Sequence, residues 1–181
     1  MTRTLEPINT YDVQAALRRE HFLAQHPYPF LVHALGTLQN LDPAKVDDLT
    51  TDRLLLERPR QSLGDSILVA ELVPKDPDQD IVTIGVAQSC DVLLDDASVS
   101  KRHAWFECVD EGNGDVWRLW DDDSSAGTQV NSEPLQPRAP RVLSSGDQIT
   151  LGYVELMFFT NEAFYDLIHG LYASAPSQIV R

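Results

Sequence analysis

The sequence is poor in positive charge. Its 181 residues include 14 lysines and arginines against 28 aspartates and glutamates, which gives a net charge of −14 at pH 7. Nucleic acids and anionic membrane surfaces both select proteins with basic patches. The charge therefore argues against both kinds of partner. Any phosphate that the protein binds must be held by local hydrogen-bond donors against an unfavourable overall field.

The chain also has few cysteines and no long apolar run. Its two cysteines, Cys90 and Cys108, cannot form a disulfide framework, and each lies in an apolar, strand-like run. We expect both thiols to be reduced core groups. No apolar run reaches the length of a membrane span, and the first residues lack the apolar stretch of a signal peptide. We therefore expect a cytoplasmic protein, with enough apolar residues for a packed core.

The first third of the chain predicts helices. A helix capped by Thr10 is expected to end near His26, because two prolines follow. A second, short helix is expected over residues 43–49, with Asp42 as its N-cap and Pro43 at its first position. The apolar run 30–35 fits a helix or a strand. We therefore predict a mostly helical N-terminal extension over residues 1–61.

From about residue 62 the pattern changes to short apolar segments separated by polar turns. Strands are expected at 67–73, 81–84, 92–94, 103–109, 116–120, 128–131, 148–151 and 155–159. This near-regular spacing predicts an antiparallel β-sandwich or barrel. Residues 162–171 carry apolar side chains at helical spacing, which predicts a short C-terminal helix packed on the sandwich. The predicted sandwich domain spans 62–172, and 173–181 is expected to be a flexible tail.

Two polar loops carry the groups that suit an anion. Ser100 supplies a hydroxyl, and Lys101 supplies an ammonium and a backbone N–H, although a plain polar turn would look the same. Residues 121–128 read Asp-Asp-Asp-Ser-Ser-Ala-Gly-Thr. They lack the alternating carboxylates and the distal glutamate of a calcium loop, so we expect no metal. Gly127 is expected to adopt a positive φ.

His103 follows Ser100 by three residues at the start of a predicted strand. A serine beside a histidine suggests nucleophilic catalysis, but no third group orients the imidazole and no nucleophile elbow is present. We therefore expect His103 to hold the loop by hydrogen bonds rather than to act as a general base.

Together these segments resemble the forkhead-associated (FHA) domain family. The family pattern runs from a strand ending in Gly-Arg, through Ser-x-x-His and Ser-x-Asn-Gly-Thr-x-x-Asn, to Gly-Asp and a Leu-Gly hairpin. The resemblance covers residues 62–159. The matching segments are Ile84-Gly85, Cys90-Asp91, 98–104, 124–131, Leu143, Gly146-Asp147 and Leu151-Gly152.

The resemblance implies an FHA-type antiparallel β-sandwich whose loops bind phosphothreonine peptides on partner proteins, with no catalytic residue, cofactor or metal. It assigns two groups of residues. The candidate phosphopeptide-binding residues are Ser100, Lys101, Arg102 and Ser125. The loop-shaping residues are Gly85, His103, Gly127, Thr128 and Asn131.

Two departures from the family pattern bear on function. Val86 stands where the family has an arginine that pairs with phosphate, and Ala126 stands where it has an asparagine that binds the peptide backbone. A charge-assisted hydrogen bond contributes about 1.5–3 kcal/mol and a neutral one about 1 kcal/mol. Losing both removes roughly two to three decades of affinity. We therefore predict a non-catalytic protein-interaction module in which phosphothreonine recognition is weakened or lost.

Three alternatives remain at this point. The first is a fully functional phosphothreonine-binding protein that acts downstream of a Ser/Thr kinase. The second is an enzyme that uses Ser100 with His103, or a metal held by residues 121–123. The third is a structural subunit in which the first sixty or so residues bind the partner and the sandwich is a scaffold.

Overall fold

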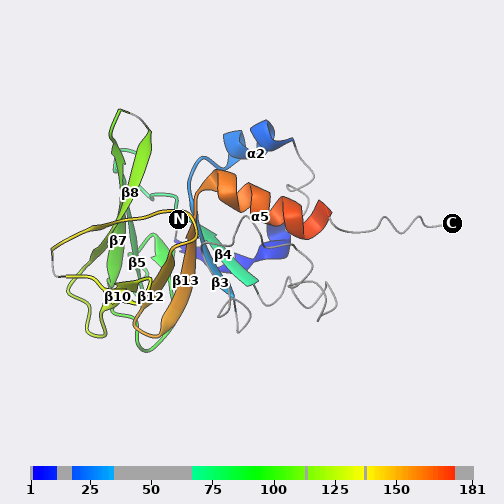
Figure 1. Ribbon diagram of the computed structural model, residues 1–181. Helices are drawn as coiled ribbons and strands as arrows, with labels where there is room; N and C mark the ends of the chain where they lie inside the picture. Colours follow the sequence, from blue (N-terminus) through cyan, green and yellow to red (C-terminus); the bar gives the residue numbers. More distant parts are fainter. Residues whose placement is uncertain (1, 12–17, 35–66, 113, 137, 174–181) are drawn as a thin grey trace.

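The protein folds into two facing β-sheets with helices packed on one side (Figure 1). The computed structural model describes residues 2–11, 18–34, 67–112, 114–136 and 138–173. In this part of the chain, no helix is long and apolar enough to cross a membrane.

The first sheet has six strands in the order β1-β6-β5-β7-β8-β11. Their bounds are β1 Arg3–Thr4, β6 Val92–Leu93, β5 Ile81–Gly85, β7 Ala104–Asp110, β8 Asp115–Asp121 and β11 Arg141–Val142. Strand β6 pairs in parallel with β1 and β5, whereas the other pairs are antiparallel.

The second sheet has seven strands in the order β10-β9-β12-β13-β3-β4-β2, and all its pairs are antiparallel. Their bounds are β10 Glu133–Pro134, β9 Thr128–Val130, β12 Gln148–Leu151, β13 Val154–Phe159, β3 Phe30–Ala34, β4 Ile67–Glu71 and β2 Glu6–Pro7.

The main core lies between the two sheets. Successive side chains of a strand point to opposite faces, so every second residue of each strand faces inward. Phe106 and Leu119 of the six-stranded sheet and Phe158 of the seven-stranded sheet belong to this core and are almost fully buried. The short apolar segments that predicted the strands thus supply the inter-sheet core.

A second core covers the other face of the seven-stranded sheet. Helices α2 (Arg19–Gln25) and α5 (Asn161–Ala173) and the 3-10 turn η1 (Ile8–Tyr11) supply its outer layer (Figure 1). The rings of Phe30 and Phe164 stack there with centroids 3.9 Å apart. Because both faces of this sheet are covered, its central strands read as continuous apolar runs, such as the run from Leu156 to Phe159.

Most of the predicted strands, and the C-terminal helix, are confirmed. The prediction for residues 1–61 needs correction, because Phe30–Ala34 forms strand β3 between β13 and β4. The described part of the helix expected from Thr10 to His26 is α2, which begins at Arg19. The boundary at residue 62 therefore does not separate an extension from the sandwich. The helix expected over 43–49 and the tail 174–181 lie outside the described residues.

The N-terminal segment connects the two sheets. Strand β1 extends the six-stranded sheet, and β2, one residue later, extends the seven-stranded sheet. Buried Glu71 of β4 lies 3.4 Å from the Arg3 guanidinium and 3.2 Å from Nδ1 of His26. A buried carboxylate requires such partners.

Candidate functional site

Three loops meet where β5 ends and β7 begins. We call them the apical loops: residues 86–91, 94–103 and 122–127. The first two run against each other, because the N–H of Val86 donates to the Ser100 carbonyl at 3.1 Å and the N–H of Ala87 donates to the Lys101 carbonyl at 2.9 Å. Backbone pairing therefore sets the position of the 94–103 loop relative to the end of β5.

Gly85 permits this close approach. A Cβ at that position would lie 2.4 Å from the Lys101 carbonyl oxygen and 2.9 Å from the Ser100 carbonyl oxygen. Both neighbours are backbone atoms whose own hydrogen bonds fix them, so no side chain fits. The loop-shaping role that the resemblance implies for Gly85 thus has a physical basis in the structure.

His103 joins two of the apical loops from below. Its side chain is fully buried. Nδ1 accepts a hydrogen bond from the Ser100 N–H at 3.0 Å, and Nε2 lies 3.1 Å from the Gly127 carbonyl oxygen. These contacts fit a neutral ring that carries its proton on Nε2. Burial lowers the pKa of His103 below 6.5, and the Gly127 carbonyl and Asp121 offset only part of that effect.

This geometry indicates that His103 holds the two loops together and does not act as a general base. Both ring nitrogens are hydrogen-bonded to backbone groups, and the Ser100 hydroxyl is bonded to the Ser125 N–H instead of to the ring. A general base would need hydrogen-bond reach to the proton that it removes. The Ser100 and His103 pair therefore lacks the arrangement of a nucleophile and its base.

Ser100 and Ser125 lie side by side across two loops. The N–H of Ser125 donates to Oγ of Ser100 at 3.0 Å. The Ser100 hydroxyl proton remains able to point toward an anion. Gly127 has φ +82°, as the sequence predicts, and this conformation turns the 122–127 loop back toward Ser100.

Asp121 braces the 122–127 loop from inside. Its carboxylate accepts hydrogen bonds from the Ser124 hydroxyl at 2.6 Å and the Thr128 hydroxyl at 2.6 Å. Burial acts to raise the pKa of Asp121, but these hydrogen bonds outweigh it and the pKa lies below 3.8. The first carboxylate of the 121–123 run is thus occupied by protein donors. Within the described residues, no three His, Cys, Asp or Glu side chains gather as a metal site would require.

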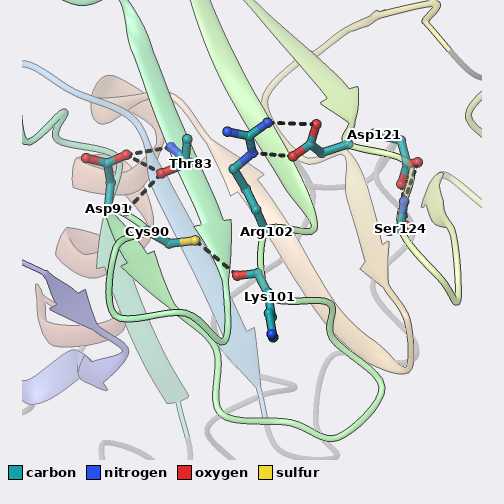
Figure 2. A network of polar contacts seen from close by, with 8 residues as sticks. Thr83, Cys90, Asp91, Lys101, Arg102, Asp121 and Ser124 are labelled. Carbon is teal, nitrogen blue, oxygen red and sulfur yellow. Dashed lines mark hydrogen bonds and ion pairs between the residues drawn. The ribbon is translucent and has the colours of Figure 1, made fainter.

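The two basic residues of the 94–103 loop differ in their surroundings (Figure 2). Arg102 forms a bidentate ion pair with Asp122 that includes a 3.1 Å contact from one of its NH groups. This hydrogen bond and charge raise the pKa of Arg102. The exposed Lys101 ammonium points away from that pair and forms no ion pair with any described residue. Lys101 is therefore the cation that remains available to an incoming anion.

The two departures from the family pattern lie on the apical loops. We use the word crevice for the part of the apical-loop surface around Ser100 and Ser125, which a hydrogen bond joins. Val86, the first residue of the first apical loop, is half-buried and packs against the main core. Ala126 is exposed beside Ser125. Neither side chain can donate a hydrogen bond. The polar groups placed at the crevice are therefore Ser100, Lys101 and the exposed Ser125.

A second polar network supports the loop that begins at Val86 (Figure 2). Buried Asp91 accepts hydrogen bonds from the N–H and hydroxyl of Thr83 at 2.7 and 2.5 Å, and from the N–H of Lys75 at 2.8 Å. The Lys75 ammonium donates to the carbonyls of Gln88 at 3.1 Å and Ser89 at 2.9 Å. Sequence reasoning missed Lys75 and Thr83, because nothing in their local pattern indicates a distant loop.

Asn131 lies away from the crevice. Its side chain donates to Asp147 at 2.7 Å and accepts from the N–H of Gln148 at 2.9 Å, at the far end of β9. The structure thus brings together Ser100, Lys101, Ser125 and the loop-shaping Gly85, His103, Gly127 and Thr128. It leaves Asn131 outside this group and commits Arg102 to Asp122.

Neither cysteine has the surroundings of a reactive thiol. Burial raises the pKa of Cys90, whose thiol points to the Lys101 carbonyl at 3.3 Å. Burial and the carboxylates of Asp115, Asp80 and Asp110 raise the pKa of Cys108 to about 11. Nucleophilic cysteines have lowered pKa values, so these thiols are structural.

Comparison with known proteins agrees with the fold and with the motifs. The FHA domain model matches residues 82–152. The oxoglutarate dehydrogenase inhibitor of Corynebacterium jeikeium is 35% identical over 124 residues, which cover 68% of this chain and 76% of that protein. The glycogen accumulation regulator GarA of Mycobacterium tuberculosis is 39% identical over 83 residues, which cover 46% of this chain and 47% of that protein.

Among solved structures, an FHA domain studied for phosphothreonine-dependent interactions is 29% identical, with a TM-score of 0.42. The match covers 51% of this chain and 83% of that one. FHA domains are protein-interaction modules that bind phosphothreonine-containing partners. On its motifs, its sandwich fold and its similarity to the C. jeikeium inhibitor, this chain belongs to the FHA domain family.

Proposed function

We propose that this protein is a non-catalytic regulatory module that binds a protein partner through its apical loops, and that its recognition of phosphothreonine is weakened. The observation that carries the proposal is the set of polar groups that the apical loops bring together. The Ser125 N–H donates to the Ser100 hydroxyl at 3.0 Å, and the exposed Lys101 ammonium forms no ion pair with a described residue. The aliphatic Val86 stands at the position of the family's arginine.

Preorganisation supports binding at this site. His103, Gly127 and Asp121 fix the loops through hydrogen bonds that are made entirely between protein atoms. A partner therefore does not have to order these loops, which lowers the free energy that binding must offset. The same groups are fully engaged with protein atoms, which leaves none of them for proton transfer or metal binding.

The charges of the site indicate weak rather than tight phosphate binding. Lys101 alone offers a mobile ammonium, which holds phosphate as a point charge and lacks the bidentate geometry of arginine. The net charge of −14 adds repulsion. Loss of one guanidinium contact removes about 1.5–3 kcal/mol of binding free energy. We therefore place the phosphate-dependent part of the affinity well below that of an arginine-containing crevice.

The named relatives suggest where the partner should be sought. Four of the similar proteins are oxoglutarate dehydrogenase inhibitors, among them those of C. jeikeium and C. glutamicum. This chain matches 76% of the first and 55% of the second. We propose that this protein acts in the cytoplasm as a regulator of a metabolic enzyme, with an oxoglutarate dehydrogenase as the first candidate.

The test is a titration of matched threonine and phosphothreonine peptides against the wild-type protein and the Ser100→Ala variant. The proposal predicts weak binding that phosphate strengthens by less than about tenfold, and that Ser100→Ala reduces. Tight, strictly phosphate-dependent binding would instead support the fully functional alternative. Hydrolase turnover that disappears with His103→Ala would contradict the proposal altogether.

A further inference from the structure

Tyr153 is an aromatic side chain with no evident role in folding. It lies between β12 and β13, in a connection that contains only Gly152 and Tyr153. It is 86% exposed, more than the other exposed large hydrophobic side chains of the described chain, Val142 at 53% and Ile81 at 38%. A ring that buries so little area contributes little to the stability of the folded state.

The connection that carries Tyr153 is attached to the apical loops. The N–H of Tyr153 donates to the Ser98 hydroxyl at 2.9 Å, and the N–H of Gly152 donates to the Gly127 carbonyl at 3.1 Å. A Cβ on Gly152 would lie only 2.6 Å from the Ser98 carbonyl oxygen, so the two segments pack closely. Ser98 precedes Ser100 by two residues, and Gly127 follows Ser125 by two. The backbone of Tyr153 therefore lies against the 94–103 loop, near Ser100 and Ser125.

Negative charge lies near the backbone of this connection, because the Ser98 hydroxyl that accepts from the Tyr153 N–H also donates to Asp96. Ser98 donates to Asp96 through its N–H at 2.8 Å and through its hydroxyl at 2.6 Å. These hydrogen bonds lower the pKa of Asp96, so the carboxylate is ionised at neutral pH. The neighbouring Asp95 is also exposed. Within the part of the chain that the structure describes, neither carboxylate forms an ion pair with a lysine or arginine.

An exposed aromatic ring on a connection that is linked through Ser98 to a carboxylate without a described counter-ion suits a cation. A guanidinium can lie over the face of tyrosine while its N–H groups meet a carboxylate. We infer that Tyr153, with Asp95 and Asp96, determines specificity by receiving a basic side chain of the partner segment that enters the crevice. The inference rests on the proposed function, because it assumes that the partner binds at the apical loops.

A basic residue in the partner would also reduce the electrostatic repulsion between this acidic protein and a phosphorylated segment. The protein carries a net charge of −14, which repels a phosphorylated segment. A positive side chain flanking the phosphothreonine lowers the charge of the segment and places attraction where the protein is locally negative. Tyr153 would then select the partners whose phosphate this crevice is able to hold.

The test uses labelled phosphothreonine peptides in which arginine replaces alanine at one flanking position at a time, with binding followed by fluorescence anisotropy. The wild-type protein is expected to bind the best arginine peptide about threefold tighter than the alanine peptide. Tyr153→Ala should abolish this preference, and Tyr153→Phe should keep it because the ring remains. Val142→Ala is the matched control, since Val142 is also exposed but lies on β11, outside the crevice.

An arm with unphosphorylated peptides separates this inference from the proposed function. If the preference for arginine depends on Tyr153 and is equally strong in phosphorylated and unphosphorylated peptides, the inference is supported. The same result would show that partner binding does not require the phosphate. Phosphopeptide binding without any arginine preference, or with a preference that Tyr153→Ala leaves unchanged, would overturn the inference and leave the proposed function standing. Failure of every peptide to bind would contradict both.

Discussion

The hydroxyl oxygen of Ser100 accepts a hydrogen bond from the backbone N–H of Ser125 at 3.0 Å. These residues belong to different loops and are 25 positions apart in the sequence. Their contact joins the two loops across the crevice, and His103 joins the same loops from beneath. Contacts within the protein thus hold the binding face together, so its stability and its affinity for a partner can be measured separately.

His103→Ala should destabilise the fold. The substitution removes a fully buried ring and leaves the N–H of Ser100 without its acceptor. An unsatisfied buried donor with a cavity costs about 2–4 kcal/mol. His21 is exposed on α2, so His21→Ala is the control and should change the free energy of unfolding by less than about 0.5 kcal/mol. Urea unfolding of both variants measures this. Equal losses of unfolding free energy in the two variants would contradict the proposed role of His103 in holding the loops.

The burial of His103 should also make stability depend on pH. Its pKa in the folded protein lies below 6.5, the ordinary value that the unfolded chain retains. Between these two values the unfolded state binds more protons, so the stability from this group is present above pH 6.5 and is lost as pH falls below it. We expect the free energy of unfolding to decrease from pH 7 to about pH 5 by more in the wild-type protein than in His103→Gln. The other histidines are common to both proteins, so their contributions cancel when the two pH dependences are subtracted. If the free energy of unfolding falls equally with pH in the wild-type protein and in His103→Gln, this prediction is wrong.

Asp91→Ala should loosen the loop that begins at Val86. The buried carboxylate accepts from Thr83 and from the N–H of Lys75, and the substitution leaves these donors without a partner. We expect a loss of about 2–4 kcal/mol in the free energy of unfolding, together with faster amide hydrogen exchange in residues 86–91. The exposed Asp78 provides the control, since Asp78→Ala should change neither quantity.

Lys101→Ala and Arg102→Ala should differ in their effect on phosphopeptide binding. The Lys101 ammonium is open, so its loss should weaken binding by about threefold to tenfold. Arg102 is engaged with Asp122, and Arg102→Ala should change affinity by less than about twofold. Titration of one phosphothreonine peptide against both variants checks this. A larger loss for Arg102→Ala would show that Arg102 leaves Asp122 for the ligand.

The sequence predicted the parts of the fold that depend on local patterns. Short apolar segments between polar turns indicated β5, β7 and β8, and helical spacing indicated α5, because each of these elements buries apolar side chains. The run 30–35 remained ambiguous because β3 is covered on both faces and so shows no alternation. The two-residue strands β1, β2, β10 and β11 were missed, since so few residues carry no period.

The candidate site was predictable to a different degree. Spaced motifs indicated Ser100, His103 and Gly127, because their backbone and hydrogen-bonding roles require particular residue types. No local signal distinguished Lys101 from Arg102. The carboxylate that engages Arg102 lies 20 positions away, on another loop. Lys75 and Tyr153 were missed for the same reason, since only the folded chain brings them to the apical loops.

The central claim is that the loops still form the binding site but lack two side-chain groups, the guanidinium expected at Val86 and the amide expected at Ala126. Val86→Arg combined with Ala126→Asn restores both. The aliphatic stem of the arginine can cover the apolar surface that Val86 covers now, while its guanidinium reaches the crevice. Calorimetric titration of a phosphothreonine peptide against this double variant and the wild-type protein is the most direct test. We predict that the variant binds at least about tenfold tighter and that the gain requires phosphate. Unchanged affinity would contradict the account, because it would show that the loops themselves no longer form a phosphate site.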